Sequence, residues 1–126
     1  MSENKAIAEV QETEVVAEGT KAQTAETTSG GVYVHTFKKP FKYGGNTYTS
    51  LTFKFEELKG RDMISIENEM MGQNEIVFAP EISASFLCRM AARAGGIGSD
   101  VIEAMPISDF SKIKNAARNF LISTGY

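Results

Sequence analysis

Only a few residues of this chain could carry out catalytic chemistry, and they lie far apart in the sequence. His35 is the single histidine and Cys88 the single cysteine. A histidine that acts as a base, or a cysteine that acts as a nucleophile, needs a second catalytic group beside it. His35 lies in the run VYVHTFK, which is typical of a strand, and Cys88 lies inside a helical pattern between Leu87 and Arg89. We therefore interpret both as structural residues.

The carboxylates offer no better basis for a catalytic or metal site. Glu56-Glu57 and Glu67 with Glu69 are close in sequence. However, neighbouring carboxylates on a protein surface are usually solvated, and no pair of His or Cys residues has the spacing of zinc ligands. The sequence therefore predicts a protein that is not an enzyme, with no cofactor, no metal site and no small-molecule substrate.

The glycine pair in FKKPFKYGGNTYTSLTF, residues 37–53, has two interpretations, a phosphate-binding loop and a turn. A phosphate-binding glycine loop needs a strand before it and a helix after it. Here a second strand-like run follows Gly45, and no Gly-Lys-Ser/Thr motif is present. The pattern favours a β-hairpin in which Tyr43 and Asn46 pair across a two-residue Gly44-Gly45 turn.

The remaining pattern is a change from strand to helix periodicity. Val32 to Lys38 and Thr47 to Phe55 read as strands, and the second alternates apolar with polar residues. Helices are predicted from Gly60 to Gly72, from Pro80 to Gly95-Gly96, after a Ser99-Asp100 cap and after a Ser108-Asp109 cap. Strands grouped before helices predict an α+β fold: an N-terminal antiparallel β-hairpin followed by three or four helices.

A disordered acidic tail is expected to precede this domain. Residues 1–30 hold no aromatic residue and six glutamates against two lysines, a net charge of −4. Such a segment buries too little apolar surface to offset its ordering entropy, although a weak helix over Ala6 to Ala17 is an alternative. The predicted division is a tail at 1–30 and a folded domain at 31–126. No secretory signal or membrane-spanning stretch is evident, and a single cysteine suits a reducing compartment, so we expect a cytoplasmic protein.

Nucleic-acid binding is the weaker of the binding functions that the sequence allows. The loop Gly95-Gly96-Ile97-Gly98 has the Gly-x-x-Gly spacing of some RNA-binding domains, but an acid follows it and the pI is about 5.2. A local basic patch could still form from Arg89, Arg93, Lys112, Lys114 and Arg118. We expect the loop to be a plain connection between helices.

Five methionines lie in the predicted domain, and they have two interpretations. They are Met63, Met70, Met71, Met90 and Met105. Methionine fills gaps in small cores, and it also forms pliable surfaces that adapt to varied apolar partners.

Three segments together resemble the tail assembly chaperone family of tailed phages, prophages and related contractile particles. They are KKPFKYGGNTYTSLTFKF, then LKGRDMISIENEM, then EISASFLCRMAARAGGIGSDVIEAMPISDFSKIKNAARNFL. The resemblance covers about residues 32–123 and rests on the order of the segments rather than on a catalytic signature. The long acidic tail and the stretch MGQNEIVFAP depart from the pattern.

The resemblance implies a non-enzymatic chaperone in the bacterial host cytoplasm. Family members bind the long, mostly helical tape measure protein and keep it soluble while tail tube protein subunits assemble. Partners are then the tape measure protein, the tail tube protein and, as an open alternative, a second copy; no nucleic acid or membrane is expected. We predict the partner-binding residues Leu51, Phe53, Phe55, Met63, Ile66 and Met70, which serve equally well as core. The alternative functions are a structural tail or connector component that stays in the particle, and a small nucleic-acid-binding regulator.

Overall fold

The computed structural model describes residues 27–29 and 31–125 of the 126-residue chain. The strands are β2 (Thr27–Ser29), β3 (Val32–Tyr43) and β4 (Asn46–Lys54). The helices are α1 (Gly60–Gly72), α2 (Ala84–Gly95), α3 (Ser99–Glu103) and α4 (Ile107–Ser123), with short 3-10 turns η1 (Phe55–Glu57) and η2 (Pro80–Ile82). The predicted α+β fold, a hairpin followed by helices, is confirmed, and four α-helices follow the hairpin.

The hairpin closes at the glycine pair, as predicted. Tyr43 pairs with Asn46, and Gly44 and Gly45 have φ angles of 58° and 81°. Positive φ at both central residues defines a primed turn, whose twist matches that of the flanking strands. The glycines therefore form a turn, and the phosphate-loop interpretation is wrong.

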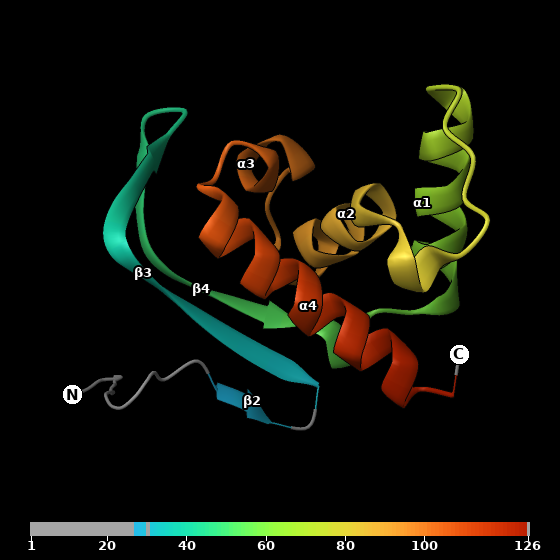
Figure 1. The fold of residues 1–126 in the computed structure, drawn as a ribbon, viewed down its shortest axis with the longest axis horizontal. Coiled ribbons are helices and arrows are strands. Elements are labelled where there is room, and N and C mark those ends of the chain that lie inside the picture. Colours follow the sequence, from blue (N-terminus) through green and yellow to red (C-terminus); the bar gives the residue numbers. More distant parts are fainter. Residues whose placement is uncertain (1–26, 30, 126) are drawn as a thin grey trace.

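A break in pairing bends the hairpin part of the way along its length. The register shifts between Thr36 and Phe41, where Pro40 cannot donate a ladder hydrogen bond. Beyond the bend the tip curves up alongside α3 (Figure 1). There Phe41 contacts the rings of Phe37, Tyr43 and Tyr48. This aromatic cluster forms the inner face of the outer half of the hairpin.

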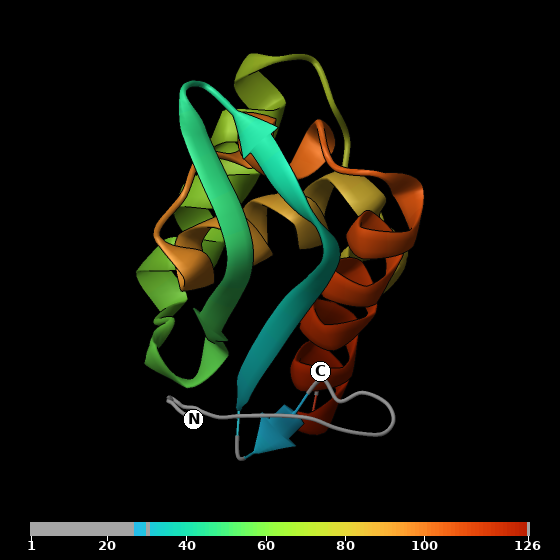
Figure 2. The same ribbon diagram turned by 90° about the vertical axis from the view of Figure 1, so that its left-hand side faces the viewer.

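The four helices lie on one face of the hairpin, and in Figure 2 the opposite face of β3 and β4 is open toward the viewer. The core forms between the inner face of the strands and α2 and α4. Its centre includes Phe53, Phe86, Ile113 and Ala117, each with 0% exposure. Apolar burial of this kind is the main stabilising contribution in a small domain.

Three predicted helix starts differ from the structure. The short helix α3 begins at Ser99 with Gly98 as its N-cap and no side-chain cap, so the predicted Ser99-Asp100 cap is wrong. Pro80 begins the turn η2, and α2 begins four residues later, where the Ser83 side chain accepts a hydrogen bond from the Phe86 N–H at 3.1 Å. The last helix has Pro106 rather than Ser108-Asp109 at its N-cap, with no side-chain cap. The predicted bounds of α1 and the predicted end of α2 near Gly95-Gly96 are confirmed.

Strand β2 lies within residues 1–30, to which the sequence assigns no strand. It pairs antiparallel with β3, from Thr27 opposite Val34 to Ser29 opposite Val32. The other residues of that predicted tail, 1–26 and 30, lie outside the described part of the chain, and so does the alternative helix over Ala6 to Ala17.

Candidate partner-binding surface

The six predicted partner-binding residues divide into a buried group and a half-buried group. Phe53, Phe55, Ile66 and Met70 are at most 2% exposed and belong to the hydrophobic core. Leu51 and Met63 are half-buried and pack against that core. In the folded chain these four buried side chains are part of the core, and Leu51 and Met63 are the two of the six that a partner can reach directly.

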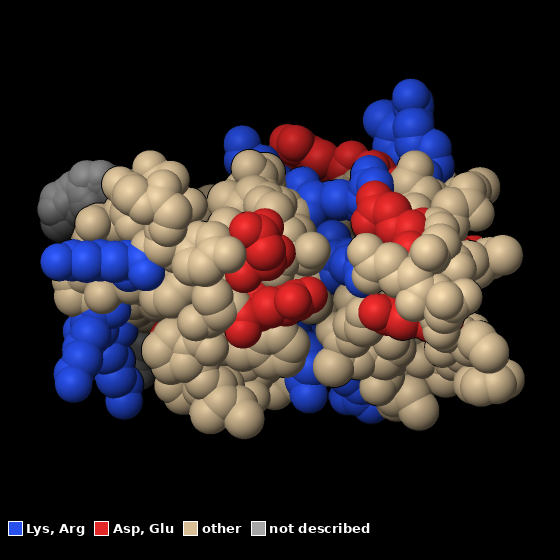
Figure 3. Space-filling view, turned by 90° about the horizontal axis from the view of Figure 1, so that it is seen from above, with Lys and Arg blue, Asp and Glu red and all other residues tan. Residues whose placement is uncertain are grey.

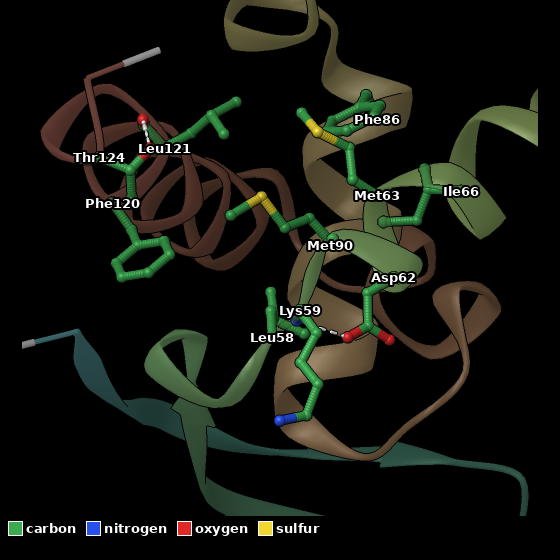
Figure 4. Close-up of a pocket in the computed structure, with 11 residues that line it drawn as sticks. Leu58, Lys59, Asp62, Met63, Ile66, Phe86, Met90, Phe120, Leu121 and Thr124 are labelled. Carbon is green, nitrogen blue, oxygen red and sulfur yellow. Dashed lines mark hydrogen bonds between the residues drawn. The ribbon is translucent and has the colours of Figure 1, made fainter.

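Met63 and Ile66 line an apolar hollow of about 200 Å³ between the start of α1, the middle of α2 and the end of α4. In Figure 4 the Met90 side chain extends toward Leu121 and Phe120, while the Met63 side chain lies beside Phe86. The hollow is open to solvent and its walls are mainly apolar. Two flexible thioethers at its walls can adjust to an apolar group of varied shape.

The polar rim of the hollow is fixed by the first turn of α1. Asp62 Oδ2 accepts a hydrogen bond from the Lys59 backbone N–H at 2.8 Å, so Asp62 caps this helix (Figure 4). That hydrogen bond, with a contribution from the Arg93 guanidinium, holds the pKa of Asp62 below its ordinary value. The Lys59 ammonium points away from the apolar walls (Figure 4).

A network of charged side chains joins α1 to α2. The nearly buried Arg89 donates to Gln73 at 2.7 Å and to Glu69 at 3.4 Å. Arg93 donates to Glu69 at 2.6 Å and to Asp62 at 3.2 Å. Arg89 and Arg93, two of the five residues of the predicted basic patch, therefore pair with carboxylates. These carboxylates offset the positive charge that the two arginines would present to a phosphate backbone.

Exposed apolar side chains concentrate in one stretch of the chain that the sequence patterns did not single out. Seven large hydrophobic residues in the described part of the chain are exposed, and five of them lie between residues 64 and 82. They are Ile64 (61%), Met71 (69%), Ile76 (74%), Phe78 (92%) and Ile82 (71%). We call these five residues the α1–η2 apolar surface. Exposed apolar side chains commonly mark an interaction site where they form one contiguous patch.

Two of these residues share one side of α1. Ile64 and Met71 are seven residues apart, which is close to two helical turns, so both project from the outer side of α1 while Ile66 and Met70 face the core. The run Ile76 to Phe78 reads as a short extended segment in the sequence, and only Val77 packs against the core. A run of only three apolar residues is too short to show a hydrophobic period, so the sequence pattern could not predict that Ile76 and Phe78 are exposed.

His35 is fully buried, and its two ring nitrogens face polar groups. Nε2 lies 2.8 Å from Asp109 Oδ1, and Nδ1 lies 3.0 Å from the Tyr33 hydroxyl. With the hydrogen on Nε2, the ring donates to Asp109 and accepts from Tyr33. The group joins β3 to α4 inside the core, away from the hollow, so its geometry is that of a structural network.

Cys88 is also buried, at 2% exposure. Burial raises the pKa of its thiol to about 12, with Glu103 adding to the rise. A thiol in this state is a weak nucleophile. Within residues 27–29 and 31–125, no three His, Cys, Asp or Glu side chains are grouped as metal ligands would be.

None of the helices in the described residues has the length and apolar character needed to cross a membrane. Comparison with known proteins finds no match among curated proteins and none among solved structures. The family described as "Phage tail assembly chaperone proteins, E, or 41 or 14" matches residues 34–122, which is more than half of the chain. The match covers the hairpin from Val34 onward, the whole α1–η2 apolar surface and every residue that lines the hollow except Thr124, and it ends within α4. The chain belongs to the phage tail assembly chaperone family.

Proposed function

We propose that this protein is a non-enzymatic chaperone that binds the tape measure protein in the cytoplasm of the bacterial host and keeps it soluble while tail tube subunits assemble. Membership of the tail assembly chaperone family supports a role with tail proteins. The observation that carries the choice of a binding role is the α1–η2 apolar surface, where Phe78 is 92% exposed. Exposure of this much apolar area in one stretch of a small domain favours a role in binding.

The chemistry of this surface suits a helical partner. An amphipathic helix presents apolar side chains every three or four residues, and the outer side of α1 presents Ile64 and Met71 at a spacing of seven. Each such side chain that is fully removed from water contributes about 1.5–3 kcal/mol before the costs of association. The adjoining hollow, with Met63 and Met90 at its walls, can accept one apolar side chain of the partner.

Co-expression with the tape measure protein, followed by affinity capture of this chain, tests the proposal. The double variant Met71→Ser, Phe78→Ser removes two exposed apolar side chains, so the fold should tolerate it. Its matched control is Ile107→Ser, Ile122→Ser, which removes exposed apolar side chains from the two ends of α4. Met63→Gln separately tests the hollow with a side chain of similar length.

We expect the parent chain and the α4 control to capture soluble tape measure protein, and the Met71/Phe78 variant to lose most of it. If the parent captures nothing and the partner stays insoluble, the proposed function is wrong. Equal capture by both double variants would leave the function in place and exclude the α1–η2 apolar surface as its site.

Two other functions give different results in the same samples. A structural tail or connector component would be found in purified particles, whereas a chaperone would be absent from them. A nucleic-acid-binding regulator would retain DNA or RNA with an affinity that falls steeply with salt, because phosphate contacts release counterions.

A further inference from the structure

The outer half of the hairpin carries positive charge with no acidic residue in its own sequence. Lys38, Lys39 and Lys42 are all exposed, and residues 31–55 contain no Asp or Glu. In Figure 3 lysine side chains project from the end of the molecule that the hairpin forms, at the left. Lys42 lies between Phe41 and Tyr43, whose rings pack on the inner face, so its side chain points outward.

Acidic groups near this part of the hairpin lie on its inner side. The Tyr43 hydroxyl donates to Asp100 of α3 at 3.1 Å, and Asp109 of α4 faces His35. The outer face of the strands is not covered by any helix of the described residues (Figure 2). The lysines are therefore available to an acidic group that approaches from outside the domain.

Strand β2, followed from Ser29 back to Thr27, runs along β3 in the direction of these lysines. Thr27 pairs with Val34 and Ser29 with Val32, so moving back along β2 follows β3 toward the hairpin tip. Among the described residues no strand continues along this edge of β3 past Val34.

The segment that precedes β2 has the charge and the length to reach the lysines. Residues 1–26 contain Glu3, Glu9, Glu12, Glu14, Glu18 and Glu26 against Lys5 and Lys21. Glu18 is nine positions before Thr27, an extended reach of about 30 Å, and Lys42 is eight positions after Val34, about 26 Å along a strand. Glu18 can therefore reach Lys42, and the four glutamates before it remain available to the same cluster.

We propose that residues 1–26 bind, within the same molecule, to the β3 edge and the lysine cluster Lys38, Lys39 and Lys42. The acidic segment then neutralises the basic end of the hairpin and covers an open strand edge that could otherwise pair with another chain. This inference is independent of the proposed tape measure binding, which uses the other end of the molecule (Figure 1).

The contact should be weak, reversible and sensitive to salt. Individual exposed lysine–glutamate pairs contribute little, and salt screens them over about 10 Å at 0.1 M ionic strength. Attachment through β2 raises the effective concentration of the segment to the order of millimolar, which favours contact within one molecule over contact between two.

Paramagnetic broadening in the full-length chain tests this contact. A nitroxide is attached at Thr20→Cys; native Cys88 does not compete, because it is buried and its thiol pKa is raised to about 12. At about 20 mM salt we expect the amide signals of Lys38 to Tyr43 to weaken severalfold, and those of α1 to be unchanged. At about 0.5 M salt, where the Debye length is a few ångströms, the signals should recover.

A charge variant with a matched control makes the result specific. Lys38→Gln, Lys39→Gln, Lys42→Gln should abolish the broadening, and it removes only exposed side chains. Lys59→Gln, Arg61→Gln, Lys114→Gln removes the same formal charge elsewhere and should leave the broadening in place. Equal broadening in both triple variants would overturn the role of the lysine cluster.

Mixing two samples separates contact within one molecule from contact between copies. Isotope-labelled chain without nitroxide is mixed with nitroxide-bearing chain without isotope. No broadening is expected in this mixture; broadening there would overturn the proposal and assign the contact to a second copy. Absence of broadening in both the single-chain and mixed samples at low salt would also overturn it.

Discussion

Among single residues, His35 has the most demanding position in the core, because it is a polar side chain with 0% exposure. Its Nε2 faces Asp109 Oδ1 at 2.8 Å, and the Asp109 side chain is itself only 17% exposed. Asp109→Ala removes that acceptor and leaves the imidazole with one fewer partner in a buried site. We expect the free energy of unfolding to fall by about 1–3 kcal/mol, measured by urea denaturation.

The control for this prediction is Asp100→Ala, which removes the exposed acceptor of the Tyr43 hydroxyl. Its unfolding midpoint should stay close to that of the parent. If Asp109→Ala lowers the free energy of unfolding no more than the control does, the buried contact between His35 and Asp109 contributes little to stability. The two residues are 74 positions apart, so no local pattern predicts their contact, and the local pattern at Asp109 predicts a helix cap instead.

Burial of Cys88 should make its thiol unreactive in the folded chain. Burial raises the pKa of its thiol from 9.0 to about 12, so the folded chain holds almost no thiolate near pH 8. A disulfide reagent should react with it orders of magnitude more slowly in the native chain than in the chain unfolded in urea. Fast reaction of the native chain at pH 8 would contradict its burial.

The raised pKa of Cys88 also affects how stability depends on pH. Because folding favours the neutral thiol, the free energy of unfolding should fall as pH rises from 9 toward 12, where only the unfolded chain ionises Cys88.

Among elements, the contact between α2 and β4 depends on the absence of one side chain. A Cβ atom on Gly95 would lie 2.8 Å from Cδ1 and Cε1 of Phe53, whose ring is fully buried. Gly95→Ala should therefore lower the free energy of unfolding by about 1–3 kcal/mol, because the core is overpacked. Thermal or urea unfolding measures the change.

Gly72→Ala is the matched control, since it adds the same methyl group at the end of α1, where no atom beyond its chain neighbours and the adjoining helix backbone lies within 4 Å. It should be neutral or stabilise the chain by up to about 1 kcal/mol, because alanine favours helix over glycine. Equal effects of the two substitutions would mean that the α2–β4 contact relaxes without cost.

The elements themselves were largely predictable, because local chemistry specifies them. Gly44-Gly45 dictated the turn, and the periodicity from Gly60 to Gly72 gave the bounds of α1. The predicted start of α2 was wrong because proline suits the first turn of a 3-10 helix as well as that of an α-helix, and Pro80 begins η2. The N-cap of α2 is Ser83. The candidate site was only partly predictable: periodicity shows that Met63, Ile66 and Met70 share one side of α1, but burial depends on which element covers that side.

In the molecule as a whole, α1 is the least embedded of the three long helices. The helices α2 and α4 pack on each other and on the hairpin, whereas α1 packs chiefly on α2. It is held there by Ile66 and Met70 and by the charged network to Arg89 and Arg93. Removal of this network should therefore loosen α1 selectively, because few other contacts hold it.

The last prediction follows from the different burial of the two arginines. The Arg89 side chain is 10% exposed and that of Arg93 is 32% exposed, so hydrogen bonds to Arg89 are better shielded from water. Arg89→Gln should weaken the attachment of α1 by about 1–3 kcal/mol, and amide hydrogen exchange across Gly60 to Gly72 should accelerate about tenfold. Arg93→Gln, the matched control, should have a smaller effect, and α4 should exchange at its parental rate in both variants. Equal acceleration in α1 and α4 would show that α1 opens only with the whole domain, and that a partner could then reach Ile66 and Met70 only through global unfolding.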